Sequence, residues 1–172
     1  MNYPFDGELF LSQKKRFEDV VFFVHFYDGS KAQMKRHIDL VNDLGFDAFA
    51  FNLRSKGAFL INPISRKKVP GIKHIWADQI SDLLNLIPQK KIIYSFSNPS
   101  SSAIEAMADR NNTDTVAMVC DSGPSNQFLG SAFQLFQHLK KDGLIASFTK
   151  TIVTPLIWSP YLHSDMHPQL DT

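Results

Sequence analysis

Apolar runs that alternate with helix-like segments place the strongest constraint on how this chain folds. The runs are 20–26 (VVFFVHF), 47–53 (DAFAFNL), 91–96 (KIIYSF) and 115–121 (TVAMVCD). They are rich in β-branched and aromatic residues and are too uniformly apolar for strands exposed on one face, so they predict strands covered on both faces. Segments with apolar residues at helical spacing lie between them. The pattern predicts an α/β fold: a mostly parallel sheet flanked by helices, with right-handed crossovers.

The composition excludes several classes of protein. With 44% hydrophobic residues among 172, the chain can bury a substantial core. Eighteen basic and seventeen acidic side chains leave a formal net charge of +1, so no strong field exists to attract nucleic acid. No apolar run approaches the roughly 18 residues of a spanning helix, and the N-terminus lacks a secretory signal pattern. We expect a cytoplasmic protein with no membrane span, no nucleic-acid partner, no metal and no cofactor.

The pattern changes after Pro124, which divides the chain into two parts. Residues 1–124 hold the alternating segments, and ELFL near the N-terminus can add a further strand to give four or five in all. Residues 126–150 have helical spacing, whereas the tail from 151 contains three prolines and is expected to be irregular. We interpret 1–124 as the core and 125–172 as a helical, cap-like segment followed by an irregular tail.

Functional residues of an open α/β sheet gather at the carboxyl ends of its strands. Four loops follow the predicted strands: HFYDGS (25–30), NLRSKG (52–57), SFSNPS (95–100) and DSGP (121–124). Ser97 lies in the third loop, between a predicted strand and the helix-like run SSSAIEAMADR. A serine on such a strand-to-helix turn is pushed out above the sheet, beside the N–H groups of the helix.

The order and spacing of these loops resemble the α/β-hydrolase superfamily, which includes esterases, lipases and other acyl hydrolases. HFYDGS resembles the oxyanion loop of that family, NLRSKG its Asp-x-Arg-Gly-His-Gly segment, SFSNP its nucleophile elbow, and VAMVCDSGP the strand and turn that follow. The resemblance covers roughly residues 20–124. It implies an acyl-serine intermediate on Ser97, a small-molecule acyl substrate, and an oxyanion hole formed by the backbone N–H groups of Tyr27 and Asn98.

The elbow departs from the family pattern at three positions. Phe26, Ser95 and Pro99 stand where the family usually has glycine. Serine is small, and proline is tolerated in the first turn of a helix, so the turn can still close. The serines around the bend also have a structural interpretation, because they could cap the third helix. The motifs upstream favour the nucleophile position for Ser97.

The acid and the histidine of a triad are harder to assign. In the family they follow two further strands beyond the one that ends at Asp121. The remaining candidates are Asp121 itself and, in the tail, His163, Asp165 and His167. We therefore interpret the chain as the N-terminal portion of a truncated α/β-hydrolase core, whose activity as an enzyme is uncertain. The alternative is a non-catalytic hydrolase remnant that binds a hydrophobic small molecule or a protein partner.

Other features carry weaker expectations. The run 115–121 would form an exposed sheet edge, which invites pairing with a second copy or with a complementing chain. Cys120, inside that run, is expected to be inert packing. His37 and His74 are expected on helix surfaces, and no histidine spacing predicts zinc.

Overall fold

The computed structural model describes residues 3–110, 114–124 and 127–170. The strands are β1 (Glu8–Phe10), β2 (Val20–Val24), β3 (Asp47–Ala50), β4 (Lys91–Phe96) and β5 (Thr115–Asp121). The helices are η1 (Lys31–Met34), α1 (Lys35–Leu44), α2 (Lys56–Ile61), α3 (Ile72–Leu86), α4 (Pro99–Asp109), α5 (Phe128–Gln134), η2 (Leu135–Leu139), α6 (Leu144–Trp158) and α7 (Met166–Leu170).

The strands form one sheet in the order β1-β3-β2-β4-β5. β3, β2, β4 and β5 run parallel, and β1 pairs antiparallel with β3. The predicted α/β class and the mostly parallel sheet are therefore confirmed, and the ELFL run supplies the fifth strand. Parallel strands need crossovers, and here helices provide them.

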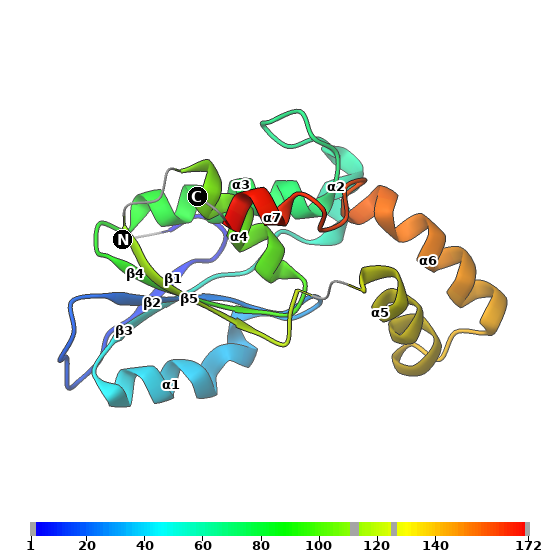
Figure 1. Cartoon of the computed structure of the whole chain (residues 1–172). Coiled ribbons are helices and arrows are strands. Elements are labelled where there is room, and N and C mark those ends of the chain that lie inside the picture. Colours follow the sequence, from blue (N-terminus) through cyan, green and yellow to red (C-terminus); the bar gives the residue numbers. More distant parts are fainter. Residues whose placement is uncertain (1–2, 111–113, 125–126, 171–172) are drawn as a thin grey trace.

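Helices cover both faces of the sheet, as Figure 1 shows. On one face, η1 and α1 bury Met34 and Ile38 against Val21 and Phe23 of β2. On the other face, α3 and α4 pack against alternate residues of the same strand, among them Phe22. Every residue of β2 is buried, which explains why the run around it carries no polar alternation.

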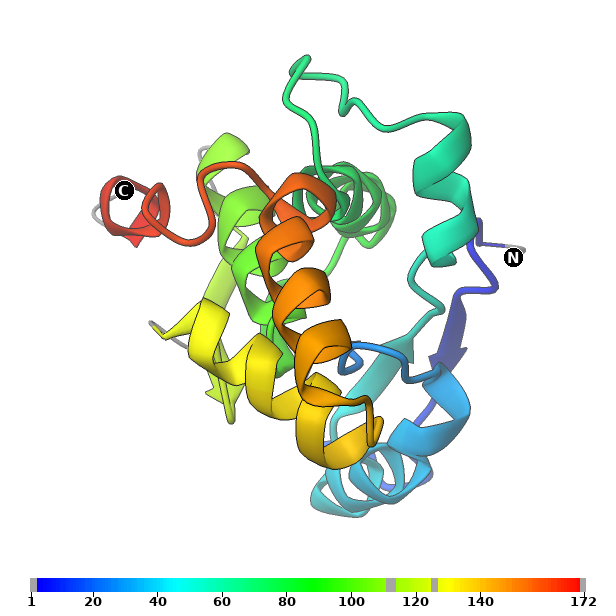
Figure 2. The same ribbon diagram turned by 90° about the vertical axis from the view of Figure 1, so that its right-hand side faces the viewer.

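α5 and α6 of the cap-like segment lie beyond one end of the sheet, whereas α7 lies beside α4 (Figure 1). Figure 2, turned so that this side faces the reader, shows α6 beside α5. α6 continues through Pro155 to Trp158, so the expectation that the tail is irregular from 151 was wrong for 151–158. Residues 159–165 have no helix or strand, and the short α7 follows. The domain boundary remains a prediction, since it adjoins residues 125–126, outside the described part.

Much of α6 is apolar on its outer side as well as its inner side. Ile145 and Phe148 are 84% and 61% exposed, and Ile152 is 59% exposed. None of the described helices is both long enough and apolar enough to cross a membrane.

β5 lies at the edge of the sheet, as its sequence predicted. Its side chains are exposed or half-buried throughout, with Val116 50% and Val119 41% exposed. Cys120 is also exposed, so the expectation that it is inert packing was wrong. An apolar edge strand of this kind offers unpaired backbone groups to another strand.

Candidate active site

Ser97 occupies a strained turn between β4 and α4. Its φ of 57° lies in the left-handed region, which costs an L-residue roughly 1–2 kcal/mol. The Ser97 N–H donates to the carbonyl of Asp121 at 2.9 Å, and its own carbonyl accepts from the Ser100 N–H at 3.1 Å. These two bonds hold the turn in place, and strain of this kind is concentrated at functional sites.

Gly123 supports the same turn from the neighbouring strand. A Cβ at this position would lie 2.7 Å from the carbonyl carbon and oxygen of Ser97, too close for any other residue without a shift. Pro99 is accommodated as expected, because it occupies the first turn of α4, where its missing N–H costs nothing. Gly123 was not singled out from the sequence, since its role depends on a contact between two loops.

The serines that follow Ser97 do not cap the helix. The N-terminus of α4 has no side-chain cap. Ser101 Oγ donates instead to the carbonyl of Asn98 at 2.8 Å, and the hydroxyls of Ser100 and Ser102 are buried without a partner among the described residues. The capping interpretation therefore does not account for this run of serines.

The predicted oxyanion loop is a tight turn braced by a histidine. The Gly29 N–H donates to the carbonyl of Phe26 at 2.9 Å. His25 Nδ1 lies 2.8 Å from that same carbonyl, and the Leu53 N–H lies 3.0 Å from His25 Nε2. Nδ1 is thus the donor and Nε2 the acceptor, which describes a neutral ring. Burial lowers the pKa of His25, although the bond to Phe26 opposes this effect. His25 therefore holds the loop and has no free nitrogen for a proton transfer.

A cavity of about 620 Å³ opens beside Ser97. Tyr27 and Asn98, the predicted oxyanion residues, line it together with Ser97. The cap-like segment supplies most of the remaining wall, including Phe128, Trp158 and His138. The lining is largely apolar, which suits an acyl chain or another hydrophobic group. No local pattern identified these cap residues, because only the folded chain brings α5, η2 and α6 to the elbow.

The four acid and base candidates lie elsewhere. Asp121 accepts from its neighbour Ser122 at 2.8 Å, and Asp165 is bonded to Lys73 Nζ at 2.5 Å. His163 is buried against the rings of Phe128 and Trp158, and His167 is exposed on α7. None of the four lines the cavity beside Ser97. They remain predictions, because the only bond between any of them and Ser97 in the described part of the chain is the one to the backbone carbonyl of Asp121.

His163 is an unusual buried histidine. Neither ring nitrogen has a hydrogen-bond partner among the described residues, and the residue is only 8% exposed. Burial lowers its pKa to about 4, with the positive charge of Lys73 acting in the same direction and Asp165 against it. The ring is therefore neutral near pH 7.

A second serine, Ser159, lies in a buried polar cluster. Ser159 Oγ is 3.0 Å from His74 Nε2, and His74 Nδ1 is 2.7 and 2.9 Å from the carboxylate oxygens of Glu105. All three residues are at most 3% exposed. His74 was expected on a helix surface, and that expectation was wrong. Its partners lie 31 and 85 positions further along the chain, so no local pattern reveals them.

Lys73 completes this cluster and occupies the place of a cation. The nitrogen and oxygen atoms of His74, Glu105 and Asp165 lie within 4.8 Å of one another, a spacing that could suit a metal. However, Lys73 Nζ is 3.3 Å from Glu105 and 2.5 Å from Asp165. The ammonium already pairs with both carboxylates, so the cluster is better explained as an ion-pair network.

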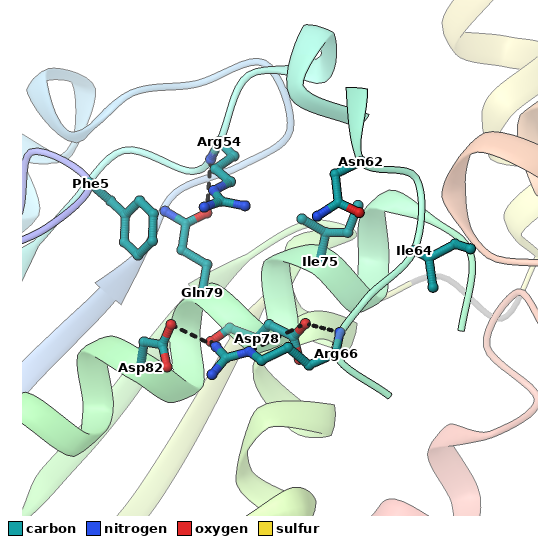
Figure 3. Close-up of a pocket in the computed structure, with 9 residues that line it drawn as sticks. All are labelled: Phe5, Arg54, Asn62, Ile64, Arg66, Ile75, Asp78, Gln79 and Asp82. Atoms are coloured by element: carbon teal, nitrogen blue, oxygen red, sulfur yellow. Dashed lines mark hydrogen bonds and ion pairs between the residues drawn. The ribbon is translucent and has the colours of Figure 1, made fainter. Parts of the chain in front are cut away.

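A smaller hollow of about 220 Å³ lies away from Ser97, beneath the 62–66 loop. Figure 3 shows Arg66 paired with Asp78 and Asp82, and Gln79 bonded to the backbone of Arg54. The Arg54 N–H donates to Gln79 at 2.9 Å, and the Arg66 guanidinium lies 2.6 Å from Asp82. Internal pairing leaves these groups little capacity to bind a ligand.

The chain resembles known proteins in its fold, as comparison with solved structures shows. No family model matches the chain, and no curated protein matches it. Among solved structures, the mature form of a lipase from Bacillus licheniformis matches 99% of this chain and 67% of its own, with a TM-score of 0.58 and 12% identity. A monoacylglycerol lipase from Paleococcus ferrophilus matches 96% and 69%, with a TM-score of 0.50 and 14% identity.

A carboxyl esterase from Bacillus coagulans matches 78% of this chain and 45% of its own, with a TM-score of 0.55 and 15% identity. The chain thus spans about two thirds of the two lipases and less than half of the esterase. Identities this low carry information about the fold and none about the reaction. With its parallel sheet, flanking helices and strand-to-helix turn at Ser97, the chain has the α/β-hydrolase fold.

Proposed function

We propose that this chain is a serine hydrolase that cleaves carboxylic esters or related acyl bonds through an acyl intermediate on Ser97. One observation carries the proposal: Ser97 is held at a positive φ between β4 and α4 and opens onto an apolar cavity of about 620 Å³. The fold of the solved hydrolases agrees with this assignment.

The reaction would proceed in two acyl-transfer steps. Ser97 Oγ attacks the carbonyl carbon of the substrate while a base takes its proton, and the electron pair of the C=O bond moves onto oxygen. The N–H groups of Tyr27 and Asn98 would stabilise that oxyanion, each worth roughly 2.7–4 kcal/mol in well-characterised enzymes. The intermediate expels the alcohol, which takes the proton, and water then releases the acid and restores Ser97.

The cavity also supports a second candidate function, the binding of a hydrophobic small molecule without chemistry. The observation in its favour is that Ser97 Oγ has no hydrogen bond to any residue that the structure describes. A hydroxyl without a base is a weak nucleophile. In this case the cavity would bind the hydrophobic molecule, and Ser97 would only form part of its wall.

Two further expectations remain part of the proposal. The exposed edge of β5 would accept a second copy of the chain or a complementing chain. The protein would act in the cytoplasm, as its composition suggests.

The deciding experiment is reaction with a fluorophosphonate, followed by intact mass and peptide mapping. We expect one adduct, located on Ser97 and lost in Ser97→Ala. Ser159→Ala is the matched control, because Ser159 is fully buried and should keep the wild-type adduct. A folded wild-type protein that forms no adduct would overturn the hydrolase and leave the binding function, which titration with a fluorescent fatty acid would then measure.

A further inference from the structure

We propose that His138 is the general base that activates Ser97, so that the cap-like segment carries half of a serine–histidine dyad. The proposal rests on the acyl-transfer function of Ser97. It assigns the base to a residue on η2, in a different part of the chain from the tail candidates His163 and His167.

The first step is the composition of the cavity wall. His138 is the only imidazole among the described residues that line the cavity beside Ser97. The other polar side chains that the cap segment contributes are Ser131, Gln134, Lys140 and Thr154. Hydroxyls and amides do not act as bases near neutral pH, and Lys140 is paired with Asp28, whereas an imidazole can act as a base.

The second step is the anchoring of the segment that carries His138. Lys140 Nζ lies 3.4 Å from Asp28 Oδ2, which joins the end of η2 to the predicted oxyanion loop. Asp28 directly follows Tyr27, and Tyr27 lines the cavity with Ser97. Both side chains are about half exposed, so the pair adds little stability, but it shows that the end of η2 lies beside the loop where the oxyanion would form.

The third step is the backbone of η2 itself. The Lys140 N–H bonds to the carbonyl of Leu135 at 3.0 Å, five residues back, as in a π-helix. Short π-helical stretches are rare and are frequent at functional sites. His138 lies within this stretch, and its side chain is exposed rather than packed into the core.

The other histidines near the elbow are less suitable as bases. His25 uses both ring nitrogens in the oxyanion loop. His74 is sealed between Glu105 and Ser159. His163 lies behind Phe128 and Trp158 and does not line the cavity.

Ser97 Oγ and the imidazole must come within hydrogen-bond reach for the proton to move. Catalytic bonds of this kind are often long in the free enzyme and shorten when substrate binds. Both groups line the same cavity, so an acyl group that fills it would lie against Ser97 and the imidazole together. The imidazole then takes the Oγ proton as the O–C bond forms, and returns it to the leaving alcohol as that bond breaks.

The test measures the rate of fluorophosphonate labelling in His138→Ala and in the size-matched His138→Gln. In this reaction the Oγ–P bond forms, fluoride leaves and the base receives the proton. We expect both variants to label about 100-fold more slowly or worse. Added imidazole should restore part of the rate in His138→Ala, since a free base can occupy the space of the missing ring. Gln137→Ala, an adjacent residue that does not line the cavity, should label at the wild-type rate.

The possible outcomes separate the two proposals. Labelling of His138→Ala at the wild-type rate would overturn the dyad and leave Ser97 as the nucleophile. A slow variant that imidazole does not rescue would mean that His138 only shapes the cavity, which also overturns the dyad. Loss of labelling in His163→Leu or His167→Ala, with His138→Ala unaffected, would place the base in the tail. A wild-type protein that never labels would overturn the hydrolase function itself.

Discussion

Ser97 and Ser159 divide between them the features of a catalytic serine. Ser97 has a strained backbone, a helix N-terminus beside it and an apolar cavity in front of it, but no base bonded to its hydroxyl. Ser159 has a histidine at 3.0 Å, and that histidine has a glutamate at 2.7 Å, but all three side chains are sealed inside the protein. The serine with access lacks the partners, and the serine with the partners lacks access.

The difference shows what hydrogen-bond geometry alone can establish. Most buried histidines satisfy their ring nitrogens, and a carboxylate and a hydroxyl are simple groups that do so. A Ser–His–Glu chain can therefore arise as structure, here joining α3 and α4 to the end of α6. Gly71 allows the close approach, because a Cβ there would lie 2.3 Å from the Trp158 carbonyl. Strain and access are better marks of a site than a triad-like chain of bonds.

The largest expected effect follows from removing the centre of the sealed cluster. Glu105→Ala leaves the ammonium of Lys73 and the ring of His74 buried with one partner fewer, which should lower the free energy of unfolding by about 3–5 kcal/mol. Urea denaturation would measure the loss. Glu8→Ala is the matched control: Glu8 pairs with Lys31 at 3.0 Å on the surface, and its removal should cost less than about 1 kcal/mol. Equal losses in the two variants would contradict a structural role for the cluster.

The sequence predicted those parts of the fold that depend on local pattern. The apolar runs predicted β2 to β5. Coverage on both faces explains the pattern in β2 and β3, which are buried throughout. β5 is exposed or half-buried along its length, so the expectation that it is covered on both faces was wrong. The edge position of β5 also followed from chain order. The tail was mispredicted because its prolines were taken as breaks, whereas Pro155 lies inside α6, which ends three residues later at Trp158.

The candidate site could be predicted only where the chain is continuous. Ser97, Asn98 and Tyr27 follow from strand-to-loop motifs, and all three line one cavity. His138 and His74 have no such local signal. His138 reaches the cavity only because η2 folds back onto the loop of Asp28, and His74 is buried only because Ser159 lies 85 positions later. Pairing over such distances is set by packing, which a single sequence does not display.

A smaller effect is expected from acid, through His163. Its pKa is about 4 in the folded protein against 6.5 for an unperturbed histidine, so below pH 6.5 the unfolded chain binds the extra proton. Its contribution to stability is therefore full above pH 6.5 and is lost as the pH falls toward 4, by roughly 2–3 kcal/mol at most. His163→Leu should reduce this pH dependence and cost little at pH 7, because the ring nitrogens have no described partner.

The measurement compares urea unfolding of the wild type and of His163→Leu at pH 7 and pH 5. As the pH falls, the free energy of unfolding should decrease more in the wild type than in the variant. An unchanged difference would mean that His163 reaches solvent and can take up its proton in the folded state. In its access to solvent, His163 would then resemble Ser97 rather than the sealed cluster around Ser159.

The smallest effect distinguishes the two serines by its sign. Ser97→Gly removes the side chain from a residue at φ 57°, which relieves backbone strain. Glycine also makes the unfolded chain more flexible, which offsets part of the gain. The net effect should be a rise in the free energy of unfolding of about 0.5–1 kcal/mol. Ser159→Gly has no strain to relieve, since its φ of −170° is extended, and it loses the bond to His74, so it should cost about 1–2 kcal/mol. Ser97→Gly should also lose the fluorophosphonate adduct, as expected where activity is held at a cost in stability. Thermal unfolding of the two variants tests this difference in sign. A destabilised Ser97→Gly would show that the serine side chain stabilises the turn, and the positive φ would then be no sign of a reactive residue.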